Sequence, residues 1–129
     1  MKELKGSFCT VINCMDGRVQ LPVNSYMTKN YKVDFVDTIT EAGPNRILCQ
    51  PKKNLSKSII NRVNISLNKH KSKIIAIVGH NDCAGSPCSD DKQITYTLKA
   101  VAFLKRKYPA IKIIGLFVDV FSWKVKEVR

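Results

Sequence analysis

The stretch Ile74-Ile75-Ala76-Ile77-Val78-Gly79-His80 (IIAIVGH) decides the fold class of this chain. Its apolar run, 74–78, does not alternate with polar residues, which is typical of a strand buried on both faces of a parallel sheet. A similar short run, Phe8 to Asn13, leads straight into Cys14-Met15-Asp16-Gly17-Arg18. Two buried strands that each end in polar side chains favour an α/β domain.

The remaining pattern predicts strands alternating with helices. Leu55, Ile59, Val63 and Leu67 recur at helical spacing. Further elements are expected as a strand over 33–39, a loop over 41–45, a helix over 92–107, a strand over 111–118 and an edge strand over 122–128. We therefore predict one α/β domain over residues 1–129. Its mostly parallel four-stranded sheet carries helices on both faces and a short edge strand at the C-terminus.

Composition narrows the class of protein. The 129 residues are 44% hydrophobic and 25% charged, as in an ordinary globular domain. No apolar run is long enough to cross a bilayer, and no signal sequence precedes the first strand, so we expect a complete cytoplasmic protein. The odd count of 5 cysteines argues against a disulfide framework and favours a metal or catalytic role for some of them.

The formal charge of +12 raises the question of nucleic-acid binding. The basic residues are spread over the outer faces and ends of the two predicted helices, and no binding motif with interleaved aromatic residues accompanies them. We therefore do not expect nucleic acid to be a partner. A positive field would also favour a small anionic substrate or product.

The polar residues at the strand ends form the candidate site. Ligand sites of parallel sheets lie at the carboxyl ends of the strands, where Cys14-x-Asp16-x-Arg18 and His80-x-x-Cys83 are expected. Two thiolates and an imidazole are good zinc ligands, and three protein ligands leave a fourth position open, as in catalytic zinc sites. Asp16 could accept a hydrogen bond from a water there or occupy the position itself. Arg18 could hold that carboxylate in a bidentate pair.

These residues resemble the signature of the β-class carbonic anhydrases, C-x-D-x-R followed later by G-H-x-x-C. Ala42-Gly43-Pro44-Asn45 resembles the A-G-N loop of that family, and 113–128 resembles its closing strand and edge hairpin. The likeness is to a short, divergent branch. It implies one Zn²⁺ per chain held by Cys14, His80 and Cys83, with Asp16 and Arg18 as the catalytic dyad. Gly43 and Gly79 are expected to allow close backbone approach and to line the substrate pocket.

The resemblance further implies a carbonate dehydratase, a zinc lyase that interconverts carbon dioxide and bicarbonate by attack of zinc-bound hydroxide, and a homodimer. Hydrolysis of carbonyl sulfide or carbon disulfide on the same zinc site is an alternative. The short N-terminal segment and the short stretch after Cys83 motivate another, a non-catalytic zinc- or bicarbonate-binding module. Outside the site, we expect Cys9 in the core, Cys49 and Cys88 unpaired, and His70 at the surface.

Overall fold

The computed structural model describes residues 3, 5–51 and 53–129. In chain order its elements are β1 (Phe8–Cys14), the 3₁₀ turn η1 (Gly17–Val19), α1 (Gln20–Tyr31), β2 (Phe35–Glu41), α2 (Pro44–Cys49), α3 (Lys53–Lys69), β3 (Ile74–His80), α4 (Asp90–Lys107), β4 (Lys112–Asp119) and β5 (Lys124–Val128). Among these residues, no helix has the length and apolar character to cross a membrane.

The strands form one five-stranded sheet in the order β2-β1-β3-β4-β5. The first four are parallel, and β5 returns antiparallel to β4 at the edge. This is the predicted architecture of four parallel strands plus a short C-terminal edge strand, and the fold prediction is therefore confirmed. β1 and β3 lie side by side, with Thr10 paired to Ile75 and Ile12 to Ile77.

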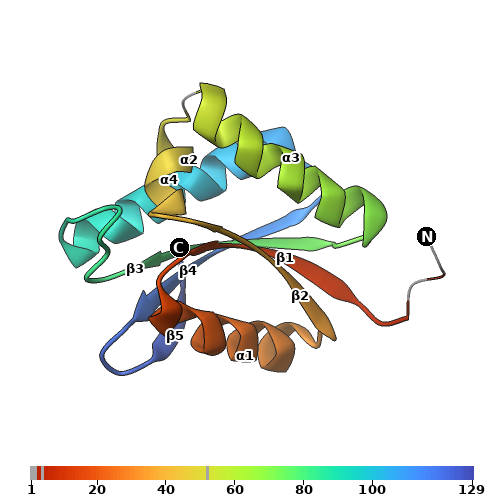
Figure 1. The fold of residues 1–129 in the computed structure, drawn as a ribbon, viewed down its shortest axis with the longest axis horizontal. Helices are drawn as coiled ribbons and strands as arrows, with labels where there is room; N and C mark the ends of the chain where they lie inside the picture. Colours follow the sequence, from red (N-terminus) through yellow and green to blue (C-terminus); the bar gives the residue numbers. More distant parts are fainter. Residues whose placement is uncertain (1–2, 4, 52) are drawn as a thin grey trace.

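Helices cover both faces of the sheet (Figure 1). α1 lies against one face, and α2, α3 and α4 lie against the other. Each face has its own apolar core, the first built around Val11, Val23 and Met27 and the second around Ile12, Ile59 and Leu104. Because the central strands contribute to both cores, their side chains are buried without alternation, as the sequence of β3 indicates.

Two helices were not predicted from the sequence. α1 has only a weak apolar stripe, in which Val23 and Met27 are its buried residues, and it contains Pro22 in its first turn. α2 begins at Pro44, so the second half of the expected loop 41–45 is helical. Proline is favoured at the first position of a helix, and Gly43 precedes it in the left-handed conformation at φ 64°. β2 lies two residues further along the chain than the expected strand over 33–39.

His70, which we expect at the surface, is partly exposed and has two side-chain contacts. Its side chain is 31% exposed, and its Nδ1 lies 2.6 Å from Oδ2 of Asp37. Its ring also stacks on Phe8, with 4.3 Å between the ring centroids. His70 therefore joins the end of α3 to β1 and β2. Cys9, by contrast, is fully buried as expected.

Candidate metal centre

The two polar motifs are brought together by the neighbouring strands β1 and β3. Cys14 is the last residue of β1 and His80 the last of β3, and both strands run in the same direction. Cys83 follows on the loop after β3. The side chains of Cys14, His80 and Cys83 each offer one ligand atom, and these atoms all lie within 4.8 Å of one another.

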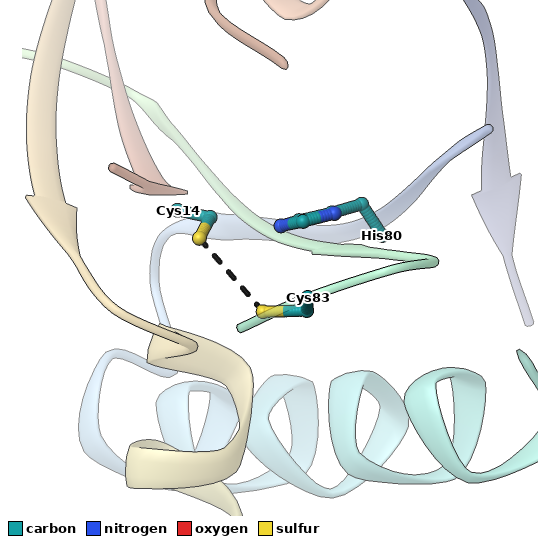
Figure 2. A group of neighbouring side chains, drawn as sticks. All are labelled: Cys14, His80 and Cys83. Carbon is teal, nitrogen blue, oxygen red and sulfur yellow. Dashed lines mark hydrogen bonds between the residues drawn. The ribbon is translucent and has the colours of Figure 1, made fainter. Parts of the chain in front are cut away.

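Figure 2 shows the His80 ring directed toward Cys14, with the two sulfur atoms beside it. The Sγ atoms of Cys14 and Cys83 are 3.9 Å apart. His80 Nδ1 lies 2.6 Å from the carbonyl oxygen of Asn81, which assigns the ring proton to Nδ1 as the donor. Nε2 is buried without a hydrogen-bond partner among the described residues. A buried acceptor without a partner, next to two thiols, fits a metal ligand.

The electrostatics of the cluster also suit a metal ion. Burial raises the pKa of the Cys14 thiol, but His80 and the backbone amides of Gly43 and Asp16 outweigh it and lower the pKa to about 7. Burial and the neighbouring Cys14 raise the pKa of Cys83 to about 11. One thiol is therefore readily ionised, and a cation would favour ionisation of the second.

Asp16 and Arg18 form a tight pair beside the cluster. The Asp16 carboxylate accepts hydrogen bonds from the Arg18 guanidinium, at 3.0 Å from Nε and 2.7 Å from Nη2, and from the Arg18 backbone N–H at 2.9 Å. The side-chain bonds from Arg18 are the main reason that the pKa of Asp16 falls to about 2. Asp16 is therefore ionised at neutral pH and held by Arg18, and its oxygens are not part of the ligand-atom group.

Two amide side chains hold the loops that carry these residues. Gln20 donates to the carbonyl oxygens of Cys14 and Asp16, at 2.7 and 3.0 Å, and so fixes the turn after β1. Asn81 donates to Asp119 at 3.1 Å and accepts from the Val120 backbone at 2.9 Å, which ties the loop after β3 to the β4–β5 turn. The hydrogen bonds of Gln20 and Asn81 cannot be predicted from a local sequence pattern.

The two glycines expected to line a substrate pocket are closely surrounded by neighbouring groups. A Cβ at Gly79 would lie 2.4 Å from Thr97 Oγ1 and 2.7 Å from Asn45 Nδ2. Gly43 adopts φ 64°, and a Cβ there would lie 3.1 Å from the Gly85 backbone. Both positions thus require glycine for close packing. A role of Gly43 or Gly79 in contacting substrate stays a prediction.

The glycine contacts belong to a buried polar cluster that sequence reasoning missed. Asn45 donates to Gln93 Oε1 at 2.9 Å and to Thr97 Oγ1 at 3.1 Å. Gln93 in turn donates to the Ser86 carbonyl at 2.6 Å. These bonds join α2, α4 and the loop after Cys83, and all four residues are buried. The cluster therefore supports the loop that carries the third candidate ligand.

A surface cavity of about 490 Å³ opens beside the cluster. It is lined by Asp16, Arg18, Asp82, Cys83, Ala84, Pro87 and Cys88. The candidate ligands are themselves almost fully covered, with 1% of His80 exposed and 5% of Cys83. A small molecule could therefore reach the cluster past Asp16 and Arg18. Cys88 lies at this cavity as a free thiol.

The fold and the cluster define a class of protein: a parallel α/β domain whose strand ends could hold a metal ion through two thiolates and an imidazole. A family model described as "Putative carbonic anhydrase" matches residues 4–129. Because the match spans nearly the whole sequence, the chain belongs to this family, as a divergent member of the β-carbonic anhydrases. A search of curated proteins gave no match.

Solved structures share the fold at low sequence identity. The carbonic anhydrase of Streptococcus mutans is 19% identical, with a TM-score of 0.65 over 93% of this chain and 81% of that one. β-Carbonic anhydrase isoform I of Trichomonas vaginalis is 17% identical, with a TM-score of 0.64 over 99% and 87% of the two chains. The β-carbonic anhydrase CafD of Aspergillus fumigatus is 13% identical, with a TM-score of 0.66 over 99% and 92%. The fold is therefore that of the β-carbonic anhydrases.

Proposed function

We propose that the protein is a zinc-dependent enzyme that reversibly hydrates carbon dioxide to bicarbonate. The observation that carries this proposal is the buried group of Cys14, His80 and Cys83 at the ends of adjacent strands, with the ionised Asp16 beside it. Membership of the carbonic anhydrase family supports the reaction class. The whole chain, 1–129, would act as one zinc-binding domain.

Cys14, His80 and Cys83 would hold one zinc ion per chain. The hydrogen bond from His80 Nδ1 to the Asn81 carbonyl directs the Nε2 lone pair into the cluster and orients the ring. Two thiolates would balance the charge of the dication in a buried site. When bound, zinc lowers the pKa of a coordinated water to about 7 and so supplies a nucleophile at neutral pH.

Asp16 would orient the reacting water. Its pKa of about 2 keeps the carboxylate ionised at neutral pH, so it can accept a hydrogen bond but does not donate one. Arg18 holds this carboxylate through its guanidinium and its backbone N–H, which fixes the direction of the free lone pairs. Carbon dioxide would enter, and bicarbonate would leave, through the cavity lined by these two residues. The proton released in hydration passes to buffer.

Stopped-flow measurement of carbon dioxide hydration on the zinc-loaded protein tests the proposal. We expect a rate above that of buffer for the wild type, loss of both zinc and activity for Cys83→Ser, and a large loss of activity with zinc retained for Asp16→Asn. Cys49→Ser changes a half-buried thiol on α2 and serves as the matched control with unaltered activity. A stoichiometrically zinc-loaded wild type that never exceeds the buffer rate would refute carbon dioxide hydration.

We also propose that two copies of the chain form a dimer. β2 is an edge strand of the sheet, and Phe35 at its start is 50% exposed. Exposed edge strands favour pairing with another chain. The related enzymes of Sordaria macrospora are described as tetrameric. Light scattering coupled to size-exclusion chromatography measures the mass, and a value near 14.6 kDa at all concentrations would contradict the dimer.

A cytoplasmic location completes the proposal. All five cysteines are free thiols, including the half-buried Cys88 that lines the cavity. Free thiols persist in reducing compartments, whereas oxidising ones favour disulfides. Cell fractionation with alkylation of free thiols tests the location, and recovery of an oxidised form outside the cytoplasm would contradict it.

A further inference from the structure

The guanidinium group of Arg18 lies between carboxylates from two different loops. On one side it donates to Asp16, two residues away in the sequence. On the other side Nη1 donates to Asp82 Oδ2 at 3.1 Å, and Nη2 donates to the Asp82 carbonyl oxygen at 3.1 Å. Asp82 lies on the loop between the candidate ligands His80 and Cys83. Arg18 is thus fixed to the loop after β3 as well as to the turn after β1.

The backbone of Asp82 is shaped for this contact. Asp82 adopts the left-handed conformation with φ 50°, which aspartate and asparagine tolerate better than most residues. In this conformation both its carboxylate and its carbonyl oxygen reach the same guanidinium. The side chain itself is 63% exposed, so it is held by Arg18 and not by burial.

We propose that Asp82 is a positioning residue that holds Arg18 in place as the partner of Asp16. The inference rests on the proposed function, because it concerns how Asp16 acts near a bound metal. To reach the fourth metal position, the Asp16 carboxylate must leave Arg18, and Arg18 is prevented from following by its separate bonds to Asp82. Asp82 therefore shifts the equilibrium toward the arrangement in which Asp16 pairs with Arg18 and the fourth position stays open to small molecules.

The exposure of the Arg18–Asp82 ion pair limits how much Asp82 can shift this equilibrium. Arg18 and Asp82 side chains are 40% and 63% exposed, and exposed ion pairs are screened by water. Loss of such a pair shifts an equilibrium by about two- to five-fold. A ligand that binds only the open arrangement has an apparent affinity proportional to the fraction of molecules in that arrangement. Its affinity therefore falls when this fraction falls. We expect Asp82 to tune the site, whereas loss of Asp16 or Arg18 would disable it.

Cobalt-substituted protein and azide as the probe test the inference. Cobalt(II) reports its coordination by visible absorption, and azide binds at an open metal position. Asp82→Gly removes the carboxylate and is compatible with φ 50°. We expect its azide dissociation constant to rise above that of the wild type by no more than about five-fold, because the apparent constant follows the fraction of molecules in the open arrangement. Asp82→Asn keeps the left-handed preference and one acceptor oxygen, and should give a smaller rise.

Two comparisons separate positioning from a direct charge effect. In an Arg18→Met background, Asp82→Gly should have no further effect on azide affinity, because Asp82 acts only through Arg18. Asp91→Asn, an exposed acid on the first turn of α4, is the matched charge control and should not change it. A second readout needs no metal: the Arg18 Nη1–H signal in NMR should be restrained in the wild type, where Nη1 donates to Asp82, and mobile in Asp82→Gly.

Failure of the inference about Asp82 can be distinguished from failure of the proposed function. Normal cobalt and azide binding with no change in Asp82→Gly, or a change that persists in the Arg18→Met background, overturns the inference and leaves the proposed function standing. An Arg18 Nη1–H signal that is equally restrained in Asp82→Gly also overturns it. A wild-type protein that binds no cobalt removes the proposed function and the inference together.

Discussion

The sulfur atoms of Cys14 and Cys83 lie 3.9 Å apart, although the two residues are 69 positions apart in the sequence. The contact exists because β1 and β3 are neighbours and end at the same edge of the sheet. His80 completes the group with a buried Nε2 that has no partner among the described residues. Four predictions test the cluster and the scaffold that builds it.

Zinc binding should release at least one proton at neutral pH. The pKa of Cys83 is raised to about 11, so this thiol is protonated before binding and must ionise to become a ligand. Cys14, with a pKa of about 7, adds part of a second proton. Zinc affinity should therefore rise about ten-fold for each pH unit above 7. Calorimetry in buffers of different ionisation enthalpy counts the protons, and a count near zero would show that the thiols are not ligands.

His80→Gln should weaken zinc binding by more than about 100-fold, since even the outer partners of metal ligands contribute 10–100-fold. The protein has 2 histidines, so His70→Gln is the matched control. His70 pairs with Asp37 away from the cluster, and its replacement should lower stability without changing zinc affinity. Competition with a chelating dye measures the zinc affinity of both variants. Equal affinities for the two variants would contradict the ligand role of His80.

Gly79→Ala should destabilise the protein by about 1–3 kcal/mol, because overpacking forces neighbouring groups to move. The added Cβ would lie 2.4 Å from Thr97 Oγ1. Gly17→Ala is the control, since nothing lies within 4 Å of a Cβ at that position. Its effect should stay within about 0.5 kcal/mol. Urea denaturation of the metal-free proteins measures the difference, and equal stabilities would contradict the tight packing at Gly79.

Tyr31→Phe should destabilise the protein by about 1 kcal/mol at pH 7, because it removes a hydrogen bond to the Glu127 carboxylate. The pKa of Glu127 is lowered in the folded protein: burial raises it, but the bonds from Tyr31, Arg129 and Tyr26 prevail. This stabilisation is therefore fully present above the ordinary value of 4.5 and is lost as the pH falls through the lowered value. The difference in free energy of unfolding between the wild type and Tyr31→Phe should therefore decrease as the pH falls.

Tyr108→Phe provides the comparison for this pH dependence. Tyr108 donates to the neutral amide oxygen of Asn64 at 2.7 Å, so the loss should be independent of pH between 7 and 3. Thermal unfolding at several pH values measures both variants. A Tyr31→Phe effect as constant as that of Tyr108→Phe would contradict the role of the Glu127 charge.

The candidate ligands could be predicted from the sequence because each lies in a short motif at the end of a buried strand. The pairing of Arg18 with Asp82 could not be predicted, since it joins residues 64 positions apart and depends on a left-handed backbone at Asp82. The same holds for Asn45, Gln93 and Thr97, which meet only when α2 packs on α4. α1 was not predicted because the packing of Val23 and Met27 stabilises this helix more than the helical tendency of its residues does.

The adjacency of β1 and β3 also has a consequence for how the chain folds. Cys14 and His80 belong to strands whose pairing closes a long segment that contains η1, α1, β2, α2 and α3. Such non-local pairing has an entropic cost of loop closure, which slows folding. The ligands therefore cannot assemble in a locally folded fragment, in contrast to a zinc finger. Metal uptake during refolding would report the completion of the central sheet.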